Sequence, residues 1–194
     1  MGDFNLNINS EDIELINSVK EGNENAFNLL VRKYQKKIYM VIRKMVLNHD
    51  DADDITQEVF IKLYHSINEF RGESKFFTYL YRMAINFSLN HLLRNKKTLM
   101  KTASIENLSI ASKDKQADEI IDAEEKTKLI EKAIESLPDQ QRAVFNLRYY
   151  ENLSYEDIST ILNKSIGGMK ANYFHAVKKI EKFLKANCKF ELID

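Results

Sequence analysis

The sequence has few of the residues that interrupt helices or cross-link a chain. Its 194 residues include one proline, five glycines, one cysteine and no tryptophan. With so few helix breakers, and with abundant Leu, Ile, Lys, Glu and Asn, the composition predicts an all-α protein. The single cysteine, Cys188, excludes a disulfide within the chain and is typical of a reducing compartment.

Long apolar stretches are also missing. No run approaches the roughly 18 residues that cross a bilayer, and the N-terminal segment lacks the pattern of a signal peptide. We therefore expect a cytoplasmic protein that does not insert into a membrane. No Gly-rich phosphate-binding loop occurs, and the four histidines lack the spacing of zinc ligands. We expect neither a cofactor nor a metal.

The formal net charge is zero, but the charges are segregated along the chain. Residues 48–58 carry five acidic side chains and no Lys or Arg. Residues 74–105 contain no acidic residue, and residues 164–185 contain six lysines and one glutamate. Separated blocks of opposite sign predict one acidic surface for docking a protein and two basic surfaces for nucleic acid.

Apolar periodicity divides the chain into helices. It predicts a loose terminus over residues 1–10, a first helix from Glu11 to near Glu21, a second from about 25 to 47, and a third capped by Asp50 or Asp51. Residues 102–120 lack aromatic side chains and strong periodicity, which is typical of a flexible linker. We predict two small helical domains joined by a flexible linker, the second with a helix-turn-helix. Their bounds are 10–100 for the first domain, 101–117 for the linker and 118–187 for the second domain.

A turn at about residues 70–74 precedes a helix that carries cations, aromatic rings and amides on one face. This mixture suits single-stranded nucleic acid, because cations bind phosphates, rings stack on bases, and amides read base edges. The pattern by itself is equally consistent with an amphipathic helix that has a basic tail. The candidate contact residues here are Lys75, Phe76, Tyr79, Arg82, Asn86 and Asn90.

Residues 154–179 have the proportions of a helix, a tight turn and a second helix. Ser154 with Asp157 forms a capping pattern, and Asn163 can adopt the left-handed conformation that ends the first helix. A second helix of this kind fits a DNA major groove, and a purely structural hairpin is the alternative. The polar side chains that it exposes are Lys164, Lys170, Asn172, His175, Lys178 and Lys179.

The acidic block also raises the question of an enzyme. Asp50, Asp51 and Asp54 match the DDxxD spacing that binds Mg²⁺ and diphosphate in all-α isoprenoid-type synthases. No second acidic motif accompanies it, and capping of a helix start already accounts for several of these acids. We therefore expect no catalytic residue and no small-molecule substrate.

Two long segments resemble a known family. DADDITQEVFIKLYHSINEFRGESKFFTYLYRMAINFSLNHLLRNKK is similar to the second conserved region of extracytoplasmic-function (ECF) bacterial sigma factors, and IESLPDQQRAVFNLRYYENLSYEDISTILNKSIGGMKANYFHAVKKI is similar to their fourth region. The resemblance spans about Glu21 to Leu184. It implies a specificity subunit of RNA polymerase without catalytic activity. The implied partners are core RNA polymerase and promoter DNA, and an anti-sigma factor is a further candidate.

The resemblance also implies roles for particular residues. Asp54, Gln57 and Glu58 fall on positions that dock the clamp helices of the largest polymerase subunit. The turn from Phe70 to Phe76, which includes Arg71, and the helix through Asn86 and Asn90 fall on the element that captures a flipped base of the −10 element. The recognition-helix positions that read the −35 element are Lys170, Ala171, Asn172 and His175.

The sequence departs from the family at several of these places. Tyr79 stands where the family usually has Trp, which gives a smaller wedge beside the melting duplex. Gly168 and Met169 replace the usual Thr-Val, and Ala171 and Asn172 replace the usual Ser-Arg. The competing hypothesis is a stand-alone helix-turn-helix regulator, which needs neither the acidic block nor the basic aromatic helix.

Overall fold

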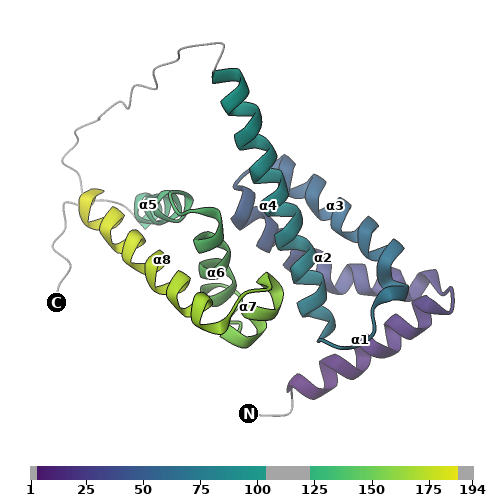
Figure 1. The fold of residues 1–194 in the computed structure, drawn as a ribbon. Coiled ribbons are helices and arrows are strands. Elements are labelled where there is room, and N and C mark those ends of the chain that lie inside the picture. The colour runs from purple at the N-terminus through teal and green to yellow at the C-terminus, as the bar shows by residue number, and fades with distance from the viewer. Residues whose placement is uncertain (1–3, 104–122, 188–194) are drawn as a thin grey trace.

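The computed structural model describes residues 4–103 and 123–187. These residues form two helical units, which Figure 1 shows side by side. The first unit comprises α1 (Phe4–Lys20), α2 (Glu24–Val46), α3 (His49–Ser66), the 3-10 helix η1 (Ile67–Glu69) and α4 (Phe76–Ala103). The second comprises α5 (Ala123–Glu135), α6 (Asp139–Tyr149), α7 (Tyr155–Leu162) and α8 (Ile166–Asn187). The described residues contain no strand, so the predicted all-α class with two helical parts is confirmed.

Helix α2 is the centre of the first unit. Asn23 caps its start by accepting hydrogen bonds from the backbone N–H groups of Asn25 (3.0 Å) and Ala26 (3.3 Å). Leu47 ends the helix in the left-handed conformation, with φ at 66°. The helix packs against α1, α3 and α4, and these contacts form the core of the unit. Its side chains in that core are Leu30, Tyr34, Ile38, Val41, Ile42 and Met45.

The N-cap of helix α3 lies two residues before Asp50, the nearer of the two predicted caps. The cap is Asn48, in an extended conformation, whose side-chain oxygen accepts a hydrogen bond from the backbone N–H of Asp51 at 3.0 Å. The prediction that Asp50 or Asp51 caps this helix is therefore wrong. Both aspartates lie in the first turn, where their charge still favours the positive end of the helix dipole.

Two predicted boundaries also shift. Helix α1 starts at Phe4, so residues 4–10 are helical and the predicted loose terminus is wrong there. Helix α4 continues to Ala103, and residues 101–103 of the predicted linker belong to it. In both places the chain has no proline or glycine to stop a helix. Residues 104–122, with the rest of the predicted linker and the predicted start of the second domain, lie outside the described residues.

The helix-turn-helix of the second unit forms as the sequence indicated. The Ser154 hydroxyl caps α7 by accepting a hydrogen bond from the backbone N–H of Asp157 at 3.0 Å. Asn163 ends α7 in the left-handed conformation, with φ at 52°. The Ser165 hydroxyl then accepts from the backbone N–H of Gly168 at 3.1 Å, which caps α8. The predicted cap at Ser154 and the left-handed Asn163 are thus confirmed.

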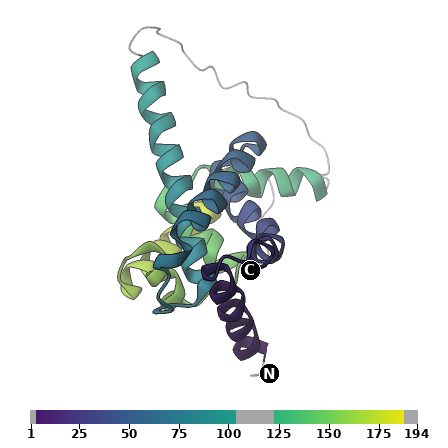
Figure 2. The same cartoon turned by 90° about the vertical axis from the view of Figure 1, so that its right-hand side faces the viewer.

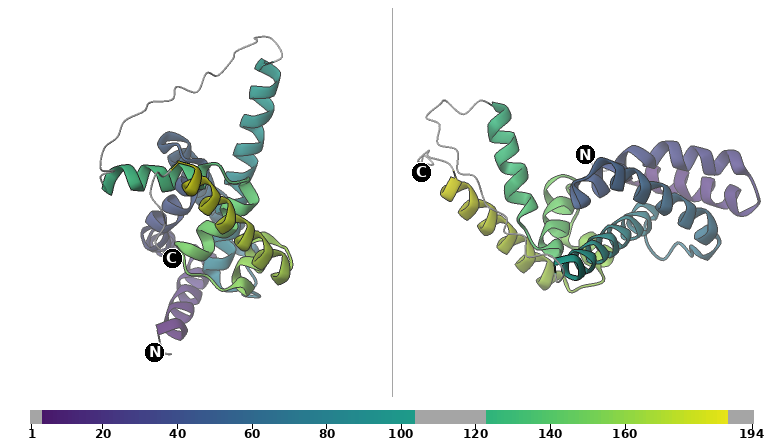
Figure 3. Two further views of the ribbon diagram at one scale, coloured as in Figure 1. Left: turned by 90° about the vertical axis from the view of Figure 1, so that its left-hand side faces the viewer. Right: turned by 90° about the horizontal axis from the view of Figure 1, so that it is seen from above.

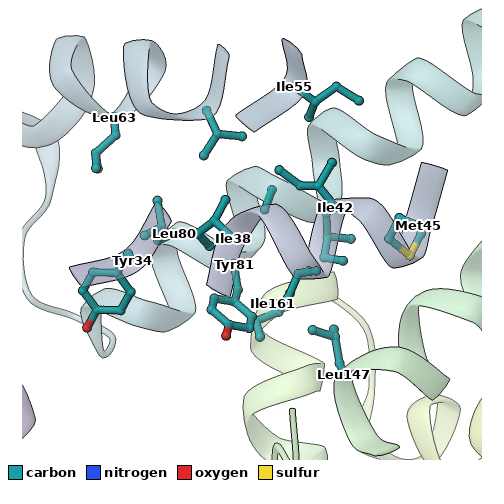
Figure 4. Packing of buried hydrophobic residues seen from close by; sticks show 14 of the residues in the cluster. Tyr34, Ile38, Ile42, Met45, Ile55, Leu63, Leu80, Tyr81, Leu147 and Ile161 are labelled. Atoms are coloured by element: carbon teal, nitrogen blue, oxygen red, sulfur yellow. The ribbon is translucent and has the colours of Figure 1, made fainter. Parts of the chain in front are cut away.

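The two units share one apolar core. Helices α6 and α7 pack against α2 and α4, as the views in Figures 2 and 3 show. In Figure 4, Leu147 and Ile161 of the second unit lie beside Tyr81, Ile42 and Met45 of the first. Within the described residues, no helix has an apolar stretch long enough to span a bilayer.

Candidate polymerase and nucleic-acid interfaces

The outer face of α3 is acidic. Asp54, Gln57 and Glu58 are all exposed, because Ile55 and Val59 on the opposite face are buried in the core. Two neighbouring acids have partners in the chain. Asp51 lies 3.1 Å from the His91 ring, and Asp53 lies 3.3 Å from the His49 ring.

The structure shows no ion pair for Asp54 or Glu58 among the residues it describes. Ile61 and Tyr64, one and two turns after Glu58, are 58% and 47% exposed. Acidic and apolar side chains together on an exposed helix face suit a basic protein partner. Sequence reasoning missed these two apolar residues, although both fall outside the buried series Ile55, Val59 and Leu63.

The turn between η1 and α4 is held in place by contacts with α1, α2 and the start of α4. Gly72 takes a positive φ of 76°, which lets the chain reverse there. The ammonium of Lys20 donates a hydrogen bond to the Phe70 carbonyl at 2.7 Å. The Phe76 ring packs edge-on against Phe70 and Tyr34, with ring centroids 5.7 and 5.4 Å apart. Phe76 is 1% exposed, so in this conformation its ring supports the turn and presents no surface to a base.

A hollow of about 250 Å³ opens at this turn. The Tyr79 ring lies at its edge, 5.2 Å from the Phe70 ring between centroids, and the Tyr79 hydroxyl donates to Ser66 at 3.1 Å. The hollow therefore combines a ring for stacking with side chains of both charges. Its lining residues are Glu69, Phe70, Arg71, Glu73, Ser74, Tyr79 and Arg82.

The structure brings only some of the predicted −10 residues to this hollow. Arg71, Tyr79 and Arg82 line it, whereas Asn86 and Asn90 are exposed on α4 one and two turns beyond Arg82. Glu69 and Glu73 are lining residues that the sequence analysis did not select. The sequence analysis considered only cations, aromatic rings and amides as base contacts. The two acids could have been recognised from their positions two residues before and after Arg71.

The predicted recognition helix presents a basic face. Met169 and Ala176 of α8 are buried, which holds the helix against α6 and α7. The Lys170 ammonium lies 5.8 Å from the Tyr155 ring centroid, and the Lys178 ammonium lies 4.7 Å from that of Phe174. Of the predicted −35 contacts, Asn172 is partly buried; the exposed ones are Lys164, Lys170, Ala171, His175, Lys178 and Lys179.

The fold and the exposed surfaces together indicate a class of protein. Two helical units, one with an acidic outer face on α3 and a hollow at a turn, and the other with a basic helix-turn-helix, are typical of transcription proteins that bind both another protein and DNA. Comparison with known families narrows this class. Residues 30–98 match Sigma-70 region 2, and residues 127–180 match Sigma-70, region 4.

Known relatives cover nearly the whole chain. The RNA polymerase sigma-H factor of Pseudomonas aeruginosa is 36% identical over 183 residues, which are 90% of this chain and 94% of that protein. The ECF RNA polymerase sigma-E factor of Haemophilus influenzae is 36% identical over 180 residues, covering 88% and 93%. The chain therefore belongs to the ECF family of RNA polymerase sigma factors.

A solved structure shares the fold. The sigma factor RpoE of Bartonella quintana, in complex with the anti-sigma factor NepR, superposes with a TM-score of 0.65. It is 19% identical and covers 84% of this chain and 98% of its own. The similarity concerns the arrangement of helices in both units.

Proposed function

We propose that the two units divide the work of a sigma factor that directs promoter-specific transcription initiation. Residues 10–100 dock on core RNA polymerase through Asp54, Gln57 and Glu58 and capture an unpaired base of the −10 element. Residues 118–187 place α8 in the major groove of the −35 element, and residues 101–117 connect the two. The observation that carries the division is the hollow beside Tyr79 in the first unit.

The hollow suits a single base. Removing a base from the duplex costs a few kcal/mol, which contacts in the pocket must offset. The Tyr79 ring supplies a stacking surface, and stacking on an aromatic ring contributes about 1–3 kcal/mol per base. Arg71 and Arg82 line the hollow and can bind flanking phosphates, and the carboxylates of Glu69 and Glu73 can accept hydrogen bonds from an exocyclic amine.

This role needs no catalytic residue, cofactor or metal, because the polymerase performs the chemistry. The protein acts where bacterial RNA polymerase acts, in the cytoplasm, and its partners are core polymerase and promoter DNA. The similar sigma factor RpoE was solved in complex with the anti-sigma factor NepR, so an anti-sigma factor is a proposed third partner. A stand-alone regulator is not favoured, because the matches include region 2 as well as the helix-turn-helix region.

We expect Asn86→Ala to lower open-complex formation on duplex promoters without lowering stability. Asn86 is exposed inside α4, where alanine is a better helix former, so a loss of folding is not expected. The test compares a duplex promoter with one whose −10 region is already mismatched. Base capture by Asn86 predicts that the defect persists on the mismatched promoter and that −10 preference changes. Full activity of the variant on duplex DNA, at unchanged thermal stability, contradicts a role for Asn86.

Lys170→Ala and Lys178→Ala should have different kinds of effect on promoter binding. Lys170 lies in the first part of α8, where recognition helices meet base edges, whereas Lys178 lies two turns further on. We expect Lys178→Ala to weaken all promoters alike and Lys170→Ala to change −35 preference, with a cost of about 1–3 kcal/mol at the affected position. Holoenzyme binding across a library of −35 substitutions measures both effects. If both variants lose affinity equally for every −35 sequence, Lys170 does not read bases.

A further inference from the structure

Helix α4 extends well beyond the core of the first unit. Ser88 is still buried, whereas residues 93–100 are all exposed. Near the point where the helix leaves the core, Asp51 of α3 lies 3.1 Å from the His91 ring. Figures 1 and 2 show the end of α4, in teal, projecting past the ends of α2 and α3. The last turns of α4 therefore contribute little to the packing of the first unit.

One exposed face of α4 connects the hollow to this projecting end. Tyr79, at the edge of the hollow, is followed on the same face by Asn86 after seven residues and by Asn90 after four more. Arg94 and Lys97 follow Asn90 at spacings of four and seven residues, and both are exposed. A ring, two amides and two cations therefore lie in one line along the helix.

The projecting end is positively charged, and α4 carries no acid to offset it. Residues 74–105 contain no acidic side chain. Lys96 donates a hydrogen bond to the Asp139 carboxylate of α6 at 2.7 Å, so its charge is already paired. Arg94 and Lys97 have no ion pair within residues 4–103 and 123–187. Exposed cations are common on helices, but two unpaired cations aligned with a proposed base-binding hollow favour a polyanion that continues from it.

The length of this face corresponds to a short stretch of duplex. An α-helix rises about 1.5 Å per residue, so the distance along α4 from Tyr79 to Lys97 is about 27 Å. Duplex DNA rises roughly 3.4 Å per base pair, so 27 Å corresponds to about 8 base pairs. Because the captured base belongs to the −10 element, about 8 base pairs toward −35 end within the spacer between the two elements.

The DNA on that side of the captured base is double-stranded. A recognition helix reads the −35 element in the major groove of a duplex, so the spacer that leads to this element is duplex as well. Duplex DNA carries one phosphate charge per roughly 1.7 Å of its axis. Cations spaced along a helix can bind such a row of phosphates without reading any base.

We infer that Arg94 and Lys97 form a further DNA-binding site, which holds phosphates of the spacer duplex about 7 or 8 base pairs upstream of the base captured beside Tyr79. This inference rests on the proposed function of the first unit. The site gives the promoter a direction on α4, with the unpaired base at the start of the helix and the duplex running along it toward −35. Because phosphate contacts carry no sequence information, the site positions the DNA and adds nothing to base specificity.

The test measures the affinity gained when the upstream duplex is lengthened. Two fork templates carry the same −10 region as an unpaired strand, and neither contains a −35 element, which removes the contribution of α8. Their upstream duplex ends about 4 or about 12 base pairs beyond the captured base, so only the longer template reaches Lys97. Anisotropy of the labelled templates gives the affinity of holoenzyme assembled with full-length wild type or with the variant that combines Arg94→Ala and Lys97→Ala.

Lys36→Ala is the matched control. Lys36 is exposed on α2, away from the line of residues on α4, and has no ion pair in the part of the chain that the structure describes. Alanine is a better helix former than lysine or arginine, so none of these exposed substitutions should lower stability. Circular dichroism of each variant checks this.

Wild type and Lys36→Ala should bind the longer template about tenfold more tightly than the shorter one, whereas the double variant should gain little. On the longer template, the slope of log affinity against log salt should be less steep in the double variant by about 1.8, at roughly 0.9 per phosphate contact. Changing the sequence of the spacer should leave the gain unaltered.

An equal gain in the double variant and in wild type would overturn the inference and leave the proposed function standing. A loss of the same size on both templates would also overturn it, because the two cations would then contact the polymerase and not the spacer. Failure of the proposed function looks different. Wild-type holoenzyme would then bind both templates no better than forks of the same lengths whose −10 bases are scrambled.

Discussion

Replacing Asp54 or Glu58 by lysine should abolish binding to core RNA polymerase and leave the fold intact. Both side chains are exposed on α3 and have no ion pair among the described residues, so their charge is available to a partner. If this face docks the polymerase as proposed, a lysine at either position would meet a basic surface of the partner with a like charge. Such a juxtaposition costs several kcal/mol, which corresponds to a loss of roughly a hundredfold or more.

Competition for core polymerase measures the affinity, and circular dichroism on the same samples measures thermal stability. Glu14→Lys is a matched control, because Glu14 is exposed on α1 and undergoes the same change of charge. The control should retain wild-type affinity. Unchanged core affinity in both Asp54→Lys and Glu58→Lys would show that this face of α3 does not dock the polymerase.

Tyr79→Ala should reduce open-complex formation by about 10- to 100-fold, whereas Tyr79→Phe should retain most of it. Alanine removes the ring at the edge of the hollow, and stacking on a ring contributes about 1–3 kcal/mol per base. Phenylalanine keeps the ring and loses only the hydrogen bond to Ser66. Permanganate reactivity of the −10 strand in holoenzyme complexes measures the melted fraction.

The contact of Tyr79 with Phe70 also supports the turn, so each variant is assayed below its melting temperature with the folded fraction measured alongside. A loss that the folded fraction accounts for would assign Tyr79 to the fold alone. Equal losses in Tyr79→Phe and Tyr79→Ala would exclude stacking as the source of the effect.

The sequence alone predicts the structure correctly where interactions between neighbouring residues determine it. The spacing of Ile55, Val59, Leu63 and Ile67 predicts the buried face of α3 and η1, and all four are buried. Asn163 ends α7 in the predicted left-handed conformation because its short polar side chain tolerates positive φ. Such features depend on residues within one or two turns.

The contacts between the units could not be predicted in this way. Arg142 and Asn146 are polar residues in a helix, and their burial depends on carbonyls at Met45 and Lys44, about a hundred positions earlier in the chain. The lining of the hollow is local in the sequence but depends on the path of a turn, which helical periodicity does not predict. Glu69 and Glu73 become lining residues only because the turn at Gly72 brings them beside Tyr79.

Run-off transcription on a library of random promoter fragments, with core RNA polymerase and the full-length protein, tests the central assignment most directly. The account predicts transcripts that require the added protein and whose templates share two sequence blocks, one at −10 and one at −35. Templates that share only a single block recognised by the helix-turn-helix, or transcription unchanged by the protein, would contradict it.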